Sequence, residues 1–75
     1  MATIKEQRDF LLKEIETLTE GIIWDFEQAR EYEKDGYIAT AKSYQQKATD
    51  KVKTRDMLEA IVGSLRKLEE TEGGK

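Results

Sequence analysis

The chain has 75 residues, of which 37% are hydrophobic and 39% charged, and its 13 basic and 16 acidic side chains give a formal net charge of −3. It contains no cysteine and no histidine, which excludes disulfides, thiolate metal sites and imidazole as a general base or metal ligand. No apolar run approaches the roughly 18 residues of a membrane span, and the mild charge argues against nucleic acid or an anionic membrane as a partner. We therefore expect one small cytoplasmic domain with no cofactor.

The first predicted element is a long helix over about residues 4–34. Thr3 and Glu6 have the spacing of a capping box at its start. Its apolar residues recur at helical spacing and fall within an arc of about 80° on one face. This predicted inner stripe consists of Ile4, Leu11, Ile15, Leu18, Ile22, Phe26 and Ala29. The two consecutive four-residue steps that end at Phe26 predict a stutter, with local straightening of any supercoil.

A turn is expected at residues 35–36. Gly36 can adopt the left-handed conformation that closes a helix, and Lys34 lies in the last turn, where a positive charge favours the helix dipole. A β-hairpin turn would require alternating apolar residues on both sides. These are absent, so the pattern favours a turn between two helices.

The second predicted helix covers about residues 38–70, followed by a frayed tail at 71–75 without apolar anchors. Its inner positions alternate four-residue and three-residue steps, as in a coiled coil. They are Tyr37, Ala41, Tyr44, Ala48, Lys51, Arg55, Leu58, Val62 and Leu65. Two of these are cationic, and we expect them to extend past the core toward Glu16, Glu20 or a partner's carboxylates.

The segment from Tyr32 to Ala48 resembles the helix–turn–helix core of a tetratricopeptide repeat over about 17 residues. The resemblance implies that Gly36 forms the turn and that Ala41 and Ala48 allow the helices to approach closely. The flanking helices are twice the length of that repeat and no second copy follows, so the chain is not assigned to the family.

The predicted fold is all-α: an antiparallel two-helix hairpin that dimerises into a four-helix bundle. A turn at Gly36 pairs residues whose numbers add to roughly 73, which places Ala29 opposite Tyr44 and Leu18 opposite Arg55. Four further apolar residues are expected to reinforce the aliphatic core at the open end, namely Met57, Ile61, Leu65 and Leu68. A single hairpin of this size lacks a sufficient core and has neither a disulfide nor the usual metal ligands, which favours oligomerisation.

The candidate interface lies on the flanks of the first helix. Phe10, Thr17 and Trp24 repeat every seven residues away from the inner stripe, with Gly21 beside them and Ile23 on the opposite flank. Aromatic residues at heptad spacing are typical of an interface. The alternative is that Phe10 and Trp24 fold over the edge of their own hairpin.

The candidate ligand site is a basic stripe on the second helix that could hold phosphate groups, formed by Tyr44, Lys47, Lys51 and Arg55. The acidic stripe of the first helix has no histidine to complete a di-metal site, so no metal site is predicted. The hydroxyl side chains have no imidazole to activate them, so an enzyme is not expected.

We therefore expect a non-enzymatic module that binds itself, with a dimer favoured, and another protein. This is the character of a phage or bacterial accessory protein acting as an adaptor, inhibitor or assembly factor. The alternative is an oligomer that sequesters a small phosphorylated metabolite or nucleotide.

Overall fold

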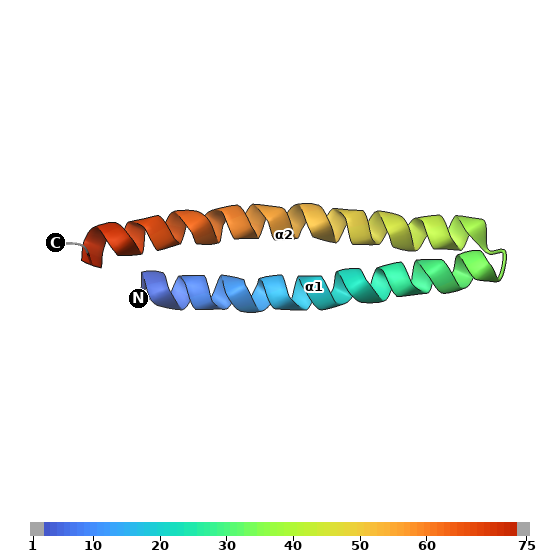
Figure 1. Ribbon diagram of the computed structural model, residues 1–75, viewed down its shortest axis with the longest axis horizontal. Helices are drawn as coiled ribbons and strands as arrows, with labels where there is room; N and C mark the ends of the chain where they lie inside the picture. Colours follow the sequence, from blue (N-terminus) through green and yellow to red (C-terminus); the bar gives the residue numbers. More distant parts are fainter. Residues whose placement is uncertain (1–2, 74–75) are drawn as a thin grey trace.

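The computed structural model describes residues 3–73 of the chain, and the side chains of residues 3–71. It consists of two α-helices, α1 (Ile4–Lys34) and α2 (Ile38–Gly73), which pack against each other along their lengths and form a helical hairpin (Figure 1). The predicted all-α hairpin is therefore confirmed. The helix α2 extends three residues beyond the expected end near 70, so part of the predicted tail is helical. Residues 74–75 lie outside the described residues.

Local signals fix the ends of α1. The Glu6 backbone N–H donates to the Thr3 hydroxyl oxygen at 3.1 Å, which satisfies one of the free donors at the helix start. At the other end, the Tyr37 N–H donates to the Tyr32 carbonyl at 2.8 Å and the Gly36 N–H donates to the Glu33 carbonyl at 3.1 Å. Gly36 has a φ of +86°. This is the Schellman arrangement, in which a left-handed glycine closes the helix and reverses the chain.

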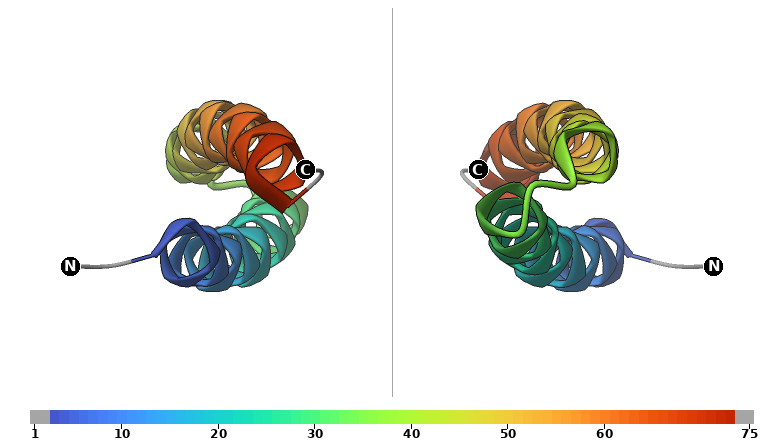
Figure 2. Two further views of the ribbon diagram at one scale, coloured as in Figure 1. Left: turned by 90° about the vertical axis from the view of Figure 1, so that its left-hand side faces the viewer. Right: turned by 90° about the vertical axis from the view of Figure 1, so that its right-hand side faces the viewer.

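Each helix presents one continuous inner row to the other, and the two helices coil around each other (Figure 2). Every residue of these rows is buried or half-buried. The α1 row is Ile4, Arg8, Leu11, Ile15, Leu18, Ile22, Asp25, Ala29 and Tyr32. The α2 row is Ala41, Tyr44, Ala48, Lys51, Arg55, Leu58, Val62, Leu65 and Glu69. Both rows alternate four-residue and three-residue steps without interruption, which is the heptad pattern of a coiled coil.

The α1 row corrects two predictions. Asp25 is buried, whereas Phe26, which was placed in the inner stripe, is 44% exposed. The step from Ile22 therefore runs to Asp25 and then to Ala29, so the predicted stutter is absent from the row. The error arose because only apolar residues were counted, and a charged residue occupies an inner position here. On α2, Tyr37 precedes the helix and is exposed, so the inner row begins at Ala41.

The register also differs from the prediction. The residue numbers of the ion pair Asp25–Lys51 and of the stacked rings Tyr32–Tyr44 each add to 76 rather than 73. Ile15 and Val62 line the same hollow, which agrees with this register. Ala29 therefore lies level with Ala48 and not with Tyr44. The two buried alanines, together with Ala41, allow the close helix approach that was expected near the turn.

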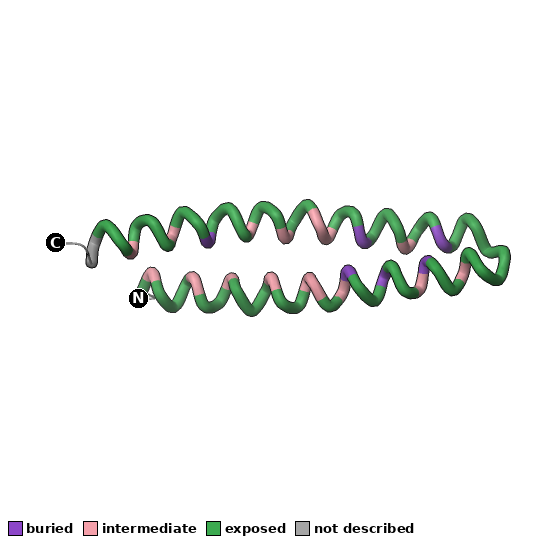
Figure 3. Tube along the Cα trace, viewed as in Figure 1, coloured by how far each residue is buried: buried purple, intermediate pink, exposed green. Residues whose placement is uncertain are grey.

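The interior changes along the hairpin. From the open end toward the turn, the interior begins with an ion pair between Arg8 and Glu69. Layers of aliphatic side chains come next, and then the charged side chains of Arg55, Lys51 and Asp25. Buried alanines and then tyrosines fill the interior nearest the turn. Most of the fully buried residues lie in the half nearer the turn (Figure 3).

The hairpin is long and thin. Its principal extents are 60 × 16 × 15 Å and its radius of gyration is 17.0 Å, against about 11 Å for a compact domain of this length. Each helix has only one neighbour, so about half of its circumference faces outward. No third layer covers the exposed large apolar side chains in the described part of the chain.

Candidate interaction surface

The buried ion pair between the helices is the first chemical feature of the hairpin. The Asp25 side chain is 2% exposed, and its Oδ2 accepts a hydrogen bond from Lys51 Nζ at 2.7 Å. The Lys51 side chain is 37% exposed and passes over Gly21, where a Cβ atom would lie 3.2 Å from Nζ. Gly21 therefore makes room for the lysine of its own hairpin. The expectation that Lys51 extends toward Glu16 or Glu20 was wrong.

Arg55 occupies the inner row one turn from Lys51 with much weaker partners. Its Nε atom is buried and has no hydrogen-bond partner among the described residues. The carboxylates of Asp56 and Glu59 each lie 3.9 Å from Nε, beyond hydrogen-bonding distance, and both are exposed. Arg55 forms no ion pair with the predicted partners Glu16 and Glu20, and the carboxylates within 4 Å of its Nε belong to its own helix.

The predicted anion-binding residues are thus only partly free. The Lys51 ammonium is paired with Asp25, and the Lys47 ammonium lies 4.8 Å from the centre of the Tyr44 ring. Arg55 faces two carboxylates of its own helix. Binding of a phosphorylated ligand by this group stays a prediction.

An aromatic cluster occupies the turn end of the hairpin. The Tyr32 and Tyr44 rings are stacked with their centroids 5.5 Å apart, and the Trp24 ring meets Tyr44 edge-on at 5.8 Å. Tyr37 meets Tyr32 edge-on at 6.2 Å. Such pairs contribute about 0.5–1.5 kcal/mol beyond the area that they bury. Trp24 therefore contacts its own hairpin on one edge while remaining 52% exposed.

Two outward faces flank the inner rows, and they differ in charge. On the first face, which we call the charge-poor face, Lys51 crosses Gly21 and Trp24 meets Tyr44. Helical periodicity then assigns the other members of this face. From α1 they are Gln7, Phe10, Glu14, Thr17, Gly21, Trp24, Gln28 and Glu31. From α2 they are Thr40, Ser43, Lys47, Asp50, Thr54, Met57, Ile61, Ser64, Leu68 and Thr71.

The opposite face, which we call the charged face, includes the hollow shared by Leu12, Glu59, Gly63 and Arg66. Its α1 members are Lys5, Asp9, Leu12, Glu16, Thr19, Ile23, Phe26, Arg30 and Glu33. Its α2 members are Ile38, Lys42, Gln45, Thr49, Val52, Asp56, Glu59, Gly63, Arg66 and Glu70. Ten of these 19 residues are charged, against four of the 18 on the charge-poor face. Of these two faces, the charged face therefore carries more than twice as many charged side chains.

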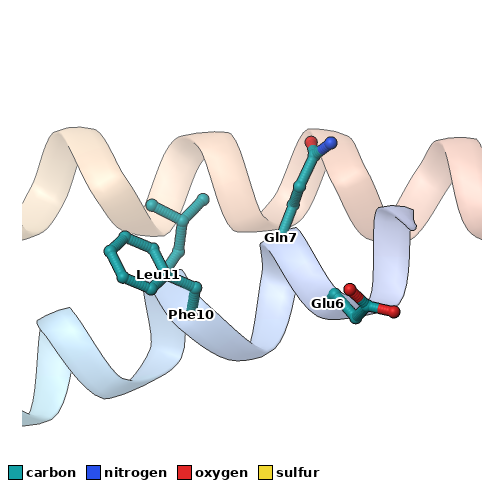
Figure 4. A pocket seen from close by; sticks show the side chains of 4 residues that line it. All are labelled: Glu6, Gln7, Phe10 and Leu11. Atoms are coloured by element: carbon teal, nitrogen blue, oxygen red, sulfur yellow. The ribbon is translucent and has the colours of Figure 1, made fainter. Parts of the chain in front are cut away.

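The charge-poor face carries large exposed apolar side chains on both helices. Phe10 and Trp24 belong to α1, while Met57, Ile61 and Leu68 belong to α2, and all five are exposed. At the open end, Phe10 and Leu11 line a hollow of about 510 Å³ together with Glu6 and Gln7 (Figure 4). The Phe10 ring lies beside the Leu11 side chain at this hollow (Figure 4).

The predicted interface residues do not all share one face. Phe10, Thr17, Gly21 and Trp24 lie on the charge-poor face, whereas Ile23 lies on the charged face. The sequence reasoning missed the α2 contribution, because Met57, Ile61 and Leu68 were assigned to the aliphatic core together with Leu65. Only Leu65 is half-buried in the inner row, and the other three are exposed. Met57, Ile61 and Leu68 are spaced by four and seven residues and lie at positions between those of the inner row. This spacing would have indicated a second apolar stripe on α2.

Searches for other kinds of site give simple results. Within residues 3–71 no group of three carboxylates is close enough to hold a metal ion. Neither helix in the described part of the chain is apolar enough to cross a membrane. No protein-family model, curated protein or solved structure matches the chain significantly.

Proposed function

We propose that this hairpin is a non-enzymatic protein–protein interaction module that binds a second copy of itself through the charge-poor face. In this role it acts as a homo-oligomeric helical adaptor, inhibitor or assembly factor. The observation that carries the proposal is a face with few charges and five exposed large apolar side chains, in a chain whose charged fraction is 39%.

Surface area supports a missing partner. The hairpin exposes 5838 Å², whereas a monomeric protein of 8.7 kDa is expected to expose about 4,700 Å². The excess of roughly 1,100 Å² exceeds the approximately 800 Å² per partner that a standard interface buries. The excess surface of the whole hairpin is therefore large enough to be covered by one standard interface.

Composition indicates which face is covered. Interface centres are depleted in charged residues and enriched in aromatic residues and methionine. Phe10, Trp24 and Met57 give the charge-poor face this composition. The charged face also exposes Leu12, Ile23, Phe26 and Ile38, but these lie among ten charged side chains.

Trp24 and Ile23 provide a matched test, because they are adjacent and are 52% and 54% exposed, yet they lie on opposite faces. Replacing a central aromatic anchor typically removes about 2–4 kcal/mol of binding energy. Trp24→Asp should therefore raise the dimer dissociation constant by about 30-fold to 1,000-fold. Ile23→Asp should leave it within about threefold.

Light scattering and sedimentation across a range of concentrations measure both variants, with circular dichroism to check that the helices persist. A monomeric wild-type chain at tens of micromolar concentration would refute the proposed self-association. Equal weakening by the two substitutions would show that the charge-poor face is not the interface.

A further inference from the structure

We infer that the second copy packs on the charge-poor face with its turn at the same end, so that α1 of each copy lies along α2 of the other. The inference rests on the proposed self-association and specifies its geometry. In this arrangement the two-fold axis runs parallel to the long axis of the hairpin, and each contact occurs twice, as in any isologous interface.

Two arrangements can stack one charge-poor face on another. A two-fold axis parallel to the hairpin places α1 on the partner's α2, whereas an axis across the hairpin places α1 on α1 and α2 on α2. Both leave neighbouring helices antiparallel, so the helix dipoles do not distinguish them. The distribution of charge and the register of the side chains do.

Charge favours the parallel axis. The segment through Asp35 carries five basic and ten acidic residues, and the remainder of the chain carries eight basic and six acidic residues, so the net charges are −5 and +2. Placing α1 on α1 would bring two acidic helices together, which opposes association. Placing α1 on α2 instead sets each acidic segment of net −5 beside the segment of net +2.

Register supports the same arrangement. Within the hairpin, level residues have numbers that add to 76, and a parallel two-fold axis preserves these levels across the interface. Phe10 then lies beside Leu68 of the partner subunit, and Gly21 lies beside Met57 of the partner subunit. Both pairs are offset by two residues, which is about 3 Å along a helix and less than one turn.

These neighbours are complementary in size and charge. Leu68 of the partner subunit can enter the hollow beside Phe10, and Met57 of the partner subunit can pack on the aliphatic stem of Lys51 where it crosses Gly21. With the same two-residue offset, the Glu31 carboxylate lies beside the Lys47 ammonium of the partner subunit. One register thus matches an apolar pair, a methionine on a lysine stem and a pair of opposite charges.

Cysteine cross-linking tests the geometry directly, because the native chain has no cysteine. Glu14 and Ser64 are both exposed on the charge-poor face, and they share the two-residue offset of the predicted contacts. A disulfide requires Cα atoms within about 7 Å. We would therefore prepare Glu14→Cys and Ser64→Cys as separate full-length chains, mix them under reducing conditions and then oxidise them.

The expected product is a disulfide between the two different variants, resolved by mass spectrometry, at about ten times the yield of either homodisulfide. An Ile23→Cys chain, on the charged face, serves as a control that should stay uncross-linked. A dominant homodisulfide of either variant would overturn the inference. A dimeric mass without any disulfide would also overturn it, while leaving self-association intact, whereas a monomeric wild-type chain would refute the self-association itself.

Discussion

The ion pair between Asp25 and Lys51 leads to an asymmetric prediction about stability. The aspartate is 2% exposed and the lysine 37% exposed, so the two charges depend on each other unequally. Without Lys51 the carboxylate remains buried with no other partner among the described residues. Without Asp25 the lysine can turn its ammonium group to water past Gly21, as long lysine side chains commonly do.

The magnitudes follow from this difference. An uncompensated buried charge destabilises a protein by about 3–5 kcal/mol, so Lys51→Met should lower the free energy of unfolding by about 3 kcal/mol once some water reaches the site. Asp25→Leu should change it by no more than about 1 kcal/mol, because apolar burial offsets the lost hydrogen bond. The double variant should be at least as stable as the native chain, since replacing a buried pair by apolar residues is often neutral or stabilising.

Urea unfolding monitored by circular dichroism provides the assay, with all variants at one protein concentration because association contributes to apparent stability. At a slope of about 1 kcal/mol per molar urea, the Lys51→Met midpoint should fall by roughly 3 M. Since a chain of 75 residues has about 4–11 kcal/mol in total, this variant retains little stability. Equal losses in the two single variants, or a double variant less stable than Lys51→Met, would refute the reasoning.

Two further substitutions test the interior and the turn. Arg55→Met should raise the free energy of unfolding by about 1 kcal/mol, because it removes a buried donor without a partner. Only two weak contacts to exposed carboxylates are lost. A lower free energy of unfolding in urea would contradict this prediction. Gly36→Ala should lower the thermal midpoint by several degrees, because the φ of +86° costs a residue with a Cβ atom about 1–2 kcal/mol. Ala39→Gly, in the first turn of α2, is the control that makes the opposite exchange of alanine and glycine nearby. An unchanged thermal midpoint in Gly36→Ala would argue against the left-handed turn.

Much of the hairpin could be predicted because its ends and turn depend on local interactions. Thr3 and Gly36 cap the ends of α1 through hydrogen bonds to residues close in sequence. The heptad pattern of α2 can be recognised even though two of its inner positions are cationic. The α1 row could not be traced fully from apolar residues alone, since Arg8 and Asp25 interrupt them. A carboxylate in the facing row can neutralise an inner cation, and Asp25 is the residue that continues the step from Ile22 toward Ala29. This pairing identifies the residue that apolar periodicity missed.

The candidate surface was harder to predict for a different reason. A flank of one helix becomes a face only when the neighbouring flank of the other helix is known, and this depends on register. With the register displaced by about three residues, Met57, Ile61 and Leu68 were counted as interior, so the face appeared to consist of α1 alone. Aromatic spacing identified Phe10 and Trp24 and placed Ile23 on the opposite flank, but it could not show which residues of α2 lie beside each flank.

The distribution of polar and apolar groups also supports the proposal that the hairpin binds a second copy. Asp25, Lys51 and Arg55 occupy inner positions, where charged groups contribute little net stability. Meanwhile Phe10, Trp24 and Met57 lie outside, on the face with the fewest charges. A monomer would be more stable with the apolar side chains inside and the charged side chains outside. In the proposed dimer a second hairpin covers the outer apolar side chains. The inner ion pair then keeps the two helices of each hairpin in the register that aligns those side chains across the dimer.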